Sequence, residues 1–262
     1  KYNVPRIVFV NKMDKTGADF EYSVQSMINR LGVKATPIQY PIGAESDFVG
    51  NIDLIEMKAY YYDGKEEEKF EVRDIPENLK ATAELWRTKM IDDVVQFDDA
   101  IMEKYLNGEE VTADEIKKCI RKGVISTELY PVLCGTAFKN KGVKKLLDAI
   151  VDFLPSPLDV PPIKAETPSG EIINVVADDN APLSALAFKV ATDPFIGRLT
   201  YIRIYSGILQ KGSYVMNNTK NKKERISRLV KMNSNARNEI DEIGAGDICA
   251  VIGLKDTTTG DT

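Results

Sequence analysis

Apolar residues in the first part of the chain alternate between short unbroken runs and helical spacing. The run Arg6 to Val10 predicts a strand that is buried on both faces, as in a parallel sheet. After a loop, apolar residues recur at helical spacing from Phe20 to Leu31, and Gly32 is placed to end that helix. A second strand is predicted over Ala35 to Tyr40, ended by Pro41. This order of elements is typical of an α/β sheet.

The same pattern returns at Tyr130 to Cys134, a predicted strand, which is followed by a loop and an amphipathic helix that ends near Leu154. The residues between the two pieces differ in character. Two hairpin strands are predicted at 52–62 and 69–72, and helices at 77–96, 98–106 and 112–126. Thr112 and Glu115 have the spacing of a capping box. We therefore expect residues 43–128 to be an α+β subdomain inserted into the α/β domain.

A proline-rich segment from Pro155 to Pro162 predicts a stiff linker, after which the pattern changes. Short β-rich runs then recur with glycines between them, at 186–190, 199–205, 213–216, 225–230 and 248–252. Regular short strands with turn signals favour a small β-barrel. We therefore expect two domains, residues 1–161 and 162–262, the first α/β and the second all-β.

The amino-acid composition excludes several kinds of catalytic and metal site. The chain has 262 residues and no histidine, which excludes Ser-His-Asp and Cys-His catalysis, histidine bases and histidine-ligated metals within it. Its 3 cysteines form no C-x-x-C pair, so we expect reduced, buried thiols. No apolar run approaches the roughly 20 residues of a membrane span. The net charge of −5 neither requires nor excludes nucleic acid. Because the chain begins at Lys1 rather than Met, we expect a piece of a longer protein.

The sharpest chemical signal is the sequence Asn11-Lys12-Met13-Asp14, directly after the first strand. Guanine presents the donors N1–H and N2–H₂ side by side, and the carboxylate of Asp14 can accept both, whereas adenine would leave it unpaired. Lys12 can lay its methylene stem over the base, and Asn11 can tie this loop to its neighbours. The alternative is a solvated turn, because Asn and Asp favour turns. The strand before the loop and the helix after it favour guanine recognition.

A second, weaker signal is Gly135-Thr136-Ala137, which also lies between a strand and a helix. Here the backbone N–H of Ala137 could meet guanine O6, because a small side chain allows close approach of the backbone. Alone, this tripeptide is no more than a glycine-containing turn. Together the two loops predict a guanine site whose cofactor-binding residues are Asn11, Lys12, Asp14, Thr136 and Ala137.

The phosphate half of a nucleotide site is missing from the sequence. There is no G-x-x-x-x-G-K-[ST] loop, and the D-x-x-G strings at 47–50 and 241–244 follow the guanine loop, so we interpret both as coincidental. We predict no catalytic residue and no metal ligand in this chain. Lys139, Lys141 and Lys144 are interpreted as a solvated face rather than as phosphate ligands.

One basic cluster stands out in the β-rich part: Lys220, Lys222, Lys223, Arg225, Arg228 and Lys231. Such a cluster could contact an RNA backbone. A strand edge that lysines keep solvated is an equally good explanation, and the residues alone do not decide between them.

Five segments resemble the bacterial elongation factor G family of translational GTPases, namely 6–20, 134–143, 153–157, 193–199 and 253–262. The resemblance runs from end to end. It implies that residues 1–161 are the C-terminal part of a P-loop GTPase G domain, with the family's inserted subdomain at about 43–128. Residues 162–262 would then be the family's second domain, a β-barrel.

The resemblance also implies a function. The family couples GTP hydrolysis to the movement of tRNA and mRNA through the ribosome, in the cytoplasm, without a membrane and as a monomer. It implies GTP or GDP as the bound nucleotide, with Mg²⁺ ligands outside this chain. It implies ribosomal RNA as a partner of the β-barrel, and tRNA and mRNA as partners of domains that are absent here. This chain alone would be inactive. The alternatives are a sister ribosomal GTPase, such as a ribosomal-protection or peptide-release factor, and a module that only binds the ribosome.

Overall fold

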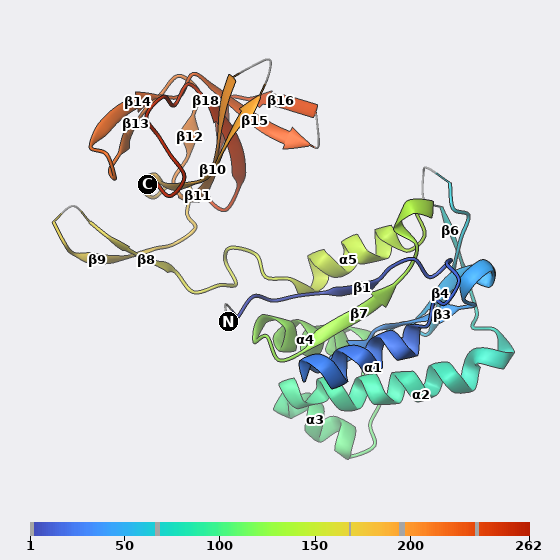
Figure 1. Ribbon diagram of the computed structural model, residues 1–262. Coiled ribbons are helices and arrows are strands. Elements are labelled where there is room, and N and C mark those ends of the chain that lie inside the picture. Colours follow the sequence, from blue (N-terminus) through green and yellow to red (C-terminus); the bar gives the residue numbers. More distant parts are fainter. Residues whose placement is uncertain (1–2, 66–68, 168, 194–196, 234–235) are drawn as a thin grey trace. The chain divides into compact units, whose positions relative to one another are not determined.

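The structure, a computed structural model, describes residues 3–65, 69–167, 169–193, 197–233 and 236–262. The chain divides into two units, Lys1–Pro155 and Ser156–Thr262, called here the N-terminal and the C-terminal unit. Each unit has its own hydrophobic core. Figure 1 shows the mixed α/β character of the first and the β-rich character of the second. Among the described residues no helix is both long and apolar enough to cross a membrane.

The N-terminal unit is built on three parallel strands in the order β1-β7-β2. These are β1 (Val8–Val10), β7 (Tyr130–Cys134) and β2 (Ala35–Pro37). The predicted parallel α/β arrangement is confirmed. The first strand packs against a hydrophobic cluster on each face, as predicted, through Phe9 on one face and through Val8 and Val10 on the other. Its residues are only half-buried, because β1 lies at an edge of the described sheet. The central strand β7 takes the buried position instead.

Helices cover both faces of this sheet. Successive strand residues point to opposite faces, and on β7 the side chains of Val132 and Cys134 pack in one cluster with α1 (Phe20–Leu31). Leu133 packs in another with α5 (Val143–Phe153). The α1 helix begins and ends as its sequence predicts. Asp19 accepts a hydrogen bond from the Tyr22 amide, and Gly32 closes the helix at φ 62°.

The predicted strand over Ala35 to Tyr40 is two strands, and that prediction is wrong. The parallel strand β2 ends at Pro37, and β3 (Gln39–Ile42) begins a separate antiparallel sheet. Pro41 does not end the strand, because it lies inside β3, opposite Asn51. The four-stranded order β3-β4-β5-β6 puts β3 at an edge, where a residue without an N–H group is tolerated.

The predicted strand over 52–62 is also wrong, because a turn divides it into β4 (Gly50–Asp53) and β5 (Lys58–Tyr62). The Asp53 carboxylate makes the turn by accepting hydrogen bonds from the amides of Ile55 (2.9 Å) and Glu56 (3.0 Å). The next strand, β6 (Phe70–Arg73), lies close to its prediction and pairs with β5.

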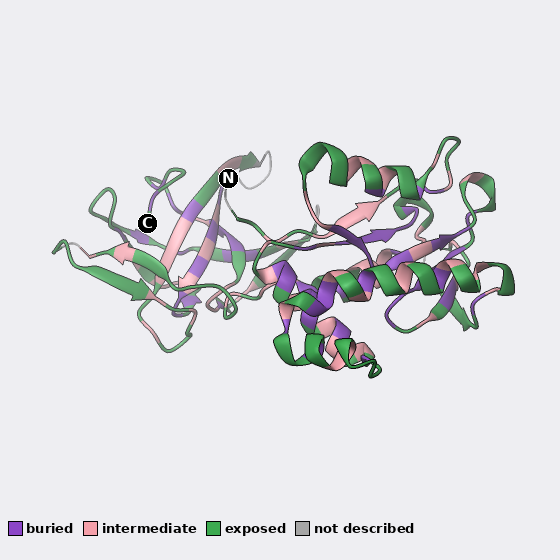
Figure 2. Ribbon diagram, turned by 90° about the horizontal axis from the view of Figure 1, so that it is seen from below, coloured by how far each residue is buried: buried purple, intermediate pink, exposed green. Residues whose placement is uncertain are grey.

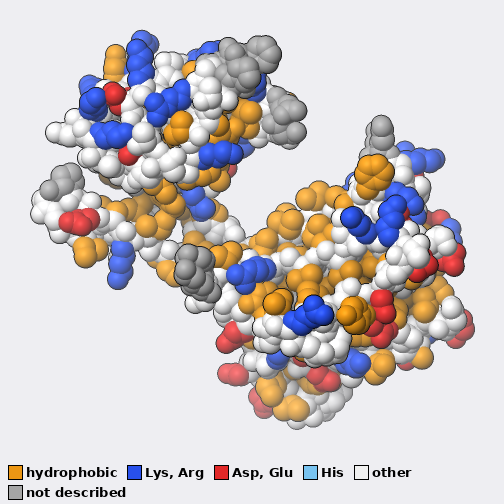
Figure 3. All heavy atoms as spheres, in the orientation of Figure 1, with side chains coloured by type: hydrophobic (Ala, Val, Ile, Leu, Met, Phe, Trp, Pro, Cys, Tyr) orange, Lys and Arg blue, Asp and Glu red, His pale blue; other side chains and the backbone are white. Residues whose placement is uncertain are grey.

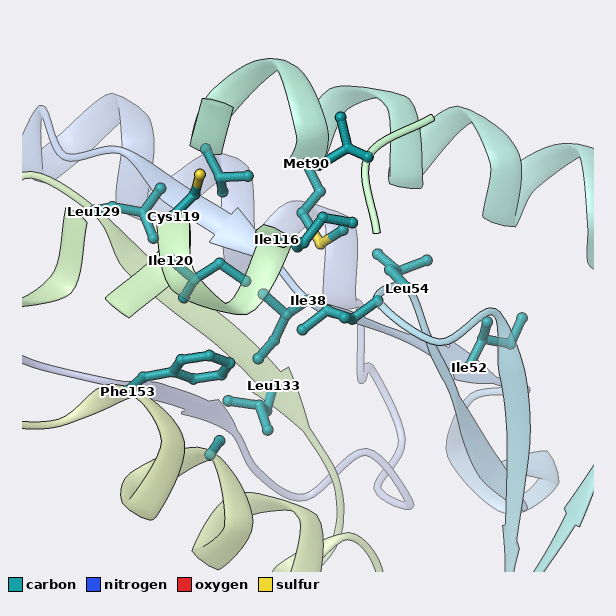
Figure 4. Close-up of a cluster of buried hydrophobic side chains, with 14 of the residues drawn as sticks. Ile38, Ile52, Leu54, Met90, Ile116, Cys119, Ile120, Leu129, Leu133 and Phe153 are labelled. Carbon is teal, nitrogen blue, oxygen red and sulfur yellow. The ribbon is translucent and has the colours of Figure 1, made fainter. Parts of the chain in front are cut away.

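The three predicted helices of the insertion are confirmed as α2 (Glu77–Val94), α3 (Asp99–Leu106) and α4 (Ala113–Ile125). The short 3-10 turns η2 (Val95–Phe97) and η1 (Glu45–Asp47) complete it. The capping box of Thr112 and Glu115 is formed. Figure 4 shows Met90, Ile116 and Ile120 of these helices meeting Leu133 and Phe153 of the α/β part. The insertion and the α/β part therefore share one core.

The C-terminal unit has a five-stranded antiparallel sheet in the order β10-β11-β18-β15-β16. Its strands are β10 (Ser184–Asp193), β11 (Gly197–Ser206), β18 (Ile248–Ile252), β15 (Arg228–Asn233) and β16 (Ala236–Ile240). Three strand pairs accompany it: β12 (Leu209–Gln210) with β17 (Glu242–Ile243), β13 (Tyr214–Asn217) with β14 (Lys222–Arg225), and β8 (Ile163–Glu166) with β9 (Ile172–Val175).

A common core supports a barrel-like arrangement, as predicted, because Ile204, Leu209, Leu229 and Val251 come from four different strands and pack together. Other details differ from the prediction. The predicted strand over 225–230 is interrupted between β14 and β15, and the β8–β9 hairpin and the strands β12, β16 and β17 were not predicted. Figure 2 shows that burial follows the inner strands and the helix faces turned toward them.

All three cysteines, Cys119, Cys134 and Cys249, are buried and free, as expected. Burial raises the pKa of the Cys119 thiol to about 11 and that of Cys249 to about 12. Both are therefore protonated at neutral pH, and protonated thiols are poor nucleophiles.

Candidate functional site

The first predicted loop leaves β1 at its carboxyl end. The side-chain Oδ1 of Asn11 accepts a hydrogen bond from the Lys12 amide (2.8 Å), and Lys12 has a left-handed backbone with φ 63°. Both side chains are exposed. Met13 points the other way and is 1% exposed, packed with Phe20 and Phe48. The buried methionine thus anchors the loop, while the residues on either side of it face outward or toward the second loop.

The second predicted loop leaves β7 beside the first. The Gly135 amide donates to the Val10 carbonyl (3.0 Å), and the Met13 amide donates to the Gly135 carbonyl (3.1 Å). A Cβ atom on Gly135 would lie 2.4 Å from the Lys141 carbonyl oxygen and 2.6 Å from the Phe9 ring. Glycine is therefore required here, because a side chain would collide with the backbone of the same loop at Lys141 and with the Phe9 ring of β1.

Side chains complete the junction between the loops. The Ala137 amide donates to Asn11 Oδ1 (3.0 Å), and the Thr136 hydroxyl donates to Asp14 Oδ1 (3.2 Å). Thr136 is 2% exposed, so its hydroxyl serves this contact rather than solvent. The structure thus brings all five predicted residues into one place, from segments more than 120 positions apart. The Ala137 amide is occupied by Asn11 in this arrangement.

Asp14 has a second partner that the sequence analysis did not identify. Lys139 Nζ lies 2.8 Å from Asp14 Oδ2, while Lys15 Nζ is 4.0 Å away. The hydrogen bond from Lys139, helped by that from Thr136, holds the pKa of the Asp14 carboxyl below its usual range. Lys139 is exposed, as the interpretation of a solvated face expects, but its ammonium is paired with Asp14. For Lys141 the interpretation is wrong, because this lysine is partly buried and its Nζ donates to the Phe48 carbonyl (3.0 Å).

The insertion holds the first loop through Glu45. The Glu45 amide donates to the Met13 carbonyl (2.8 Å), and its carboxylate accepts from the Gly17 amide (2.7 Å). Glu45 has φ 55°, a left-handed conformation that costs free energy for a residue with a side chain. The two bonds compensate for that cost. A glutamate in this conformation has no signature in the sequence, so the contact could not have been predicted.

The insertion holds the second loop through Asn51 of β4. Asn51 is fully buried, and its Nδ2 donates to the Cys134 carbonyl (2.8 Å), directly before the second loop. The same Nδ2 lies within 3.3 Å of Gln39 Oε1 and 3.4 Å of the Tyr62 hydroxyl. The sequence holds no clear signal for this contact, because Asn51 alternates with Ile52 and Asp53 and lies before the predicted strand.

Phe138 is the other residue that the sequence analysis passed over. It lies in the 3-10 turn η3 (Ala137–Lys139), next to the junction, and is 99% exposed. Its position beside the junction, rather than its exposure, makes it a candidate for contact with a ligand, because single exposed apolar residues are common on protein surfaces. Its signal in the sequence is an apolar residue placed between Ala137 and Lys139, in a loop that is otherwise small and polar.

The basic cluster of the C-terminal unit is largely paired within the unit. Its ion pairs are Lys220–Asp261 (3.1 Å), Lys222–Asp256 (3.1 Å), Arg228–Glu239 (3.3 Å) and Lys231–Asp247 (3.4 Å). Figure 3 shows Lys and Arg side chains spread over the visible face of this unit rather than gathered in one patch. Internal pairing favours the solvated-edge explanation for these four residues, because an RNA phosphate would have to displace the carboxylates.

Neither a metal cluster nor a phosphate loop accompanies the junction in the described part of the chain. No group of three or more His, Cys, Asp or Glu side chains is placed to hold a metal there. The glycine of the D-x-x-G string at 47–50 is explained by strand packing. A Cβ atom on Gly50 would lie 2.1 Å from the Tyr60 carbonyl oxygen on the neighbouring strand.

Comparison with known proteins gives matches along the whole chain. The family model described as the elongation factor Tu GTP binding domain matches residues 1–156, and elongation factor Tu domain 2 matches residues 197–262. Proteins named elongation factor G are similar over all 262 residues, at 74% identity in Ureaplasma parvum serovar 3 and 63% in Mycoplasma pneumoniae.

The chain spans 38% of the length of each of these relatives. A crystal structure of a protein from Thermus thermophilus is 29% identical, with a TM-score of 0.78 over 99% of this chain and 36% of that one. The resemblance that the sequence segments indicated is therefore confirmed at the level of the family and the fold.

Proposed function

The chain belongs to the family of the elongation factor Tu GTP binding domain, and we propose that its two joined loops recognise the base of a guanine nucleotide. The observation that carries this proposal is the junction itself. Asp14, the carboxylate suited to guanine N1–H and N2–H₂, is held by Thr136 of the second loop, and Asn11 is bonded to Ala137. A solvated turn would not need these contacts across the fold.

Each residue has a separate part in the proposed site. Asp14 accepts the two guanine donors, and Thr136 fixes its carboxylate. Lys12, whose left-handed backbone sends an exposed side chain outward, covers one face of the base with its methylene stem. The Ala137 amide turns from Asn11 to guanine O6 when the base enters. Phe138 is exposed and close enough in sequence to cover the other face.

We propose that the chain works within an elongation factor G of the relatives' length, called here the full-length factor. Residues 1–161 would supply the C-terminal part of its G domain, with the insertion at 43–128, and residues 162–262 its β-barrel domain II. The family models, which match 1–156 and 197–262, support this division. Parts outside this chain would bind the phosphates and Mg²⁺, and no step of hydrolysis is assigned to the residues described here.

The proposed activity of the full-length factor is GTP hydrolysis coupled to movement of tRNA and mRNA on the ribosome. The names of the relatives support it. The partners would be ribosomal RNA for the β-barrel, and tRNA and mRNA for other domains, with a monomeric factor in the cytoplasm. Because four cations of the basic cluster are paired internally, we expect other surface residues of the barrel to carry the RNA contact.

Calorimetric titration of the full-length factor with GDP and Mg²⁺ tests the base site, with ADP and IDP as the comparison nucleotides. Asp14→Asn should lower the preference for GDP over IDP, which lacks the N2 amine, by about tenfold to a hundredfold. Asp47→Asn is the matched control, because it removes the same charge from the exposed turn η1 of the same unit. An unchanged preference in Asp14→Asn would refute the role given to Asp14.

A further inference from the structure

The carboxylate proposed to recognise guanine is already occupied within the chain. Oδ1 of Asp14 accepts from the Thr136 hydroxyl at 3.2 Å, and Oδ2 meets the Lys139 ammonium at 2.8 Å. Only 5% of the Asp14 side chain is exposed. Each carboxylate oxygen can accept more than one hydrogen bond, but a side chain that is only 5% exposed leaves no open approach for a base that presents two donors, so one of the groups that now cover it must move first.

We propose that Lys139 is an internal competitor of the guanine base: its ammonium holds Asp14 while the site is empty, and it withdraws when the nucleotide binds. This inference rests on the proposed guanine site. The ammonium of Lys139 and the N1–H and N2–H₂ edge of guanine both offer N–H donors to the same oxygens, although only the ammonium carries a charge. Because little of the Asp14 side chain is exposed, the two compete for the same approach to the carboxylate.

The two partners of Asp14 differ in their freedom to move. Thr136 is buried, and its backbone is bonded to Lys141 by N–H···O contacts in both directions (3.0 and 3.1 Å), so its hydroxyl stays in place. The Lys139 side chain is 50% exposed, at the end of the single turn η3, and carries its charge on a flexible four-carbon stem. Withdrawal of Lys139 into water needs only a change of side-chain rotamer.

The other cation near the carboxylate, Lys15, does not compete with the base. Lys15 Nζ lies 4.0 Å from Asp14 Oδ2, beyond hydrogen-bond distance, and its side chain is 68% exposed. Lys15 therefore contributes positive potential without occupying the acceptor. The cost of breaking the Lys139 pair is subtracted from the free energy of binding, so Lys139 lowers nucleotide affinity while it stabilises the empty site.

These two effects have opposite signs, which separates the proposal from a purely structural role. A lysine that only supports the loop would, when removed, lower stability and weaken binding together. Under the proposal, Lys139→Met lowers the thermal midpoint of the nucleotide-free full-length factor and tightens GDP binding. We expect the Kd for GDP to fall by about fivefold to tenfold, the effect of one charge-assisted hydrogen bond at a half-exposed position.

The experiment compares GDP titrations and melting curves of four proteins: the full-length factor and its variants Lys139→Met, Lys139→Arg and Lys15→Met. Lys15→Met is the matched control, since it removes the same charge near Asp14 without removing a hydrogen bond, and its Kd should stay within about twofold. Lys139→Arg keeps a donor and should keep the lower affinity. If Lys139→Met does not fold, Lys139→Leu, which also lacks a donor, takes its place.

Two results overturn the proposal. One is a Lys139→Met or Lys139→Leu variant that binds GDP as weakly as the unchanged factor, or more weakly. The other is an equal gain of affinity in Lys15→Met, which would assign the effect to net charge. Failure of the guanine site itself is recognised separately, because the unchanged factor would then show no preference for GDP over ADP.

Discussion

Replacement of Asn51 by leucine tests how strongly the insertion supports the second loop. Asn51 is fully buried in β4, and its Nδ2 donates to the Cys134 carbonyl at 2.8 Å, one residue before the loop begins. Its Oδ1 lies 3.4 Å from the Cys134 thiol, and Gln39 Oε1 is 3.3 Å from its Nδ2. Leucine has a similar volume but removes every one of these polar contacts.

The expected loss of stability follows from the polar groups that lose Asn51 as a hydrogen-bond partner. A buried polar group deprived of its hydrogen bond costs about 1–3 kcal/mol. Two buried acceptors lose the Asn51 donor, the Cys134 carbonyl and the Gln39 side chain, of which Gln39 also accepts from the Cys134 amide. The sum is therefore about 2–4 kcal/mol of the free energy of unfolding of the N-terminal unit.

Urea unfolding followed by Trp86 fluorescence measures this loss in the right part of the chain. Trp86 is the single tryptophan of the sequence and packs against the core of the N-terminal unit. The midpoint should fall while the slope m stays constant, because the exposed area on unfolding barely changes. Asn29→Ala, on the exposed side of α1, is the control and should change stability by less than about 0.5 kcal/mol. An unaltered midpoint in Asn51→Leu would refute the reasoning.

Two other predictions concern the first loop and the capping box. Glu45→Ala should weaken GDP binding by the full-length factor about fivefold, because it leaves the Gly17 amide without its acceptor. Glu45→Gln keeps an acceptor and should bind GDP like the unchanged factor. Equal Kd values for Glu45→Ala and the unchanged factor would contradict this. The Lys104 ammonium lowers the pKa of Glu115 to about 2, below its unfolded value, so stability present above pH 4.5 should be lost as pH falls toward 2. The difference between the urea midpoints at about pH 7 and pH 3.5 should therefore be smaller in Glu115→Gln than in the unchanged chain, and an equal difference in both would contradict this.

The strands and helices around the site were predictable because their signals are local. An apolar run, a polar loop and a 3.6-residue period lie in that order both at 6–31 and at 130–154, and the structure has β1 with α1 and β7 with α5 there. The turn at 54–57 was not predictable in the same way. It contains neither glycine nor proline, and the Asp53 carboxylate that makes it precedes an apolar pair that continues the strand pattern.

In the candidate site, too, the residue types were predictable from the local sequence, whereas the contacts between distant segments were not. The residue types at 11–14 and 136–137 indicate guanine chemistry, because the motif names the groups that would touch a base. The contacts that hold these groups are not in the motif. Lys139 reaches Asp14 only because the strands β1 and β7 are neighbours, and that distance cannot be read from either loop alone. The pattern of charges there suggested a solvated face, and Lys139 is indeed exposed, but the pattern gave no sign of its pairing with Asp14.

The insertion connects the two loops more closely than the sequence order suggests. Glu45 contacts the first loop at both Met13 and Gly17, and Asn51, only six positions later, contacts the backbone that begins the second. A shift of this short segment would therefore displace both loops at once. Because the Asp14 carboxylate lies on the first loop and takes Thr136 and Lys139 from the second, such a shift would change the balance between Lys139 and a base at that carboxylate. Any partner that moves residues 45–51 would then alter nucleotide affinity without touching the nucleotide.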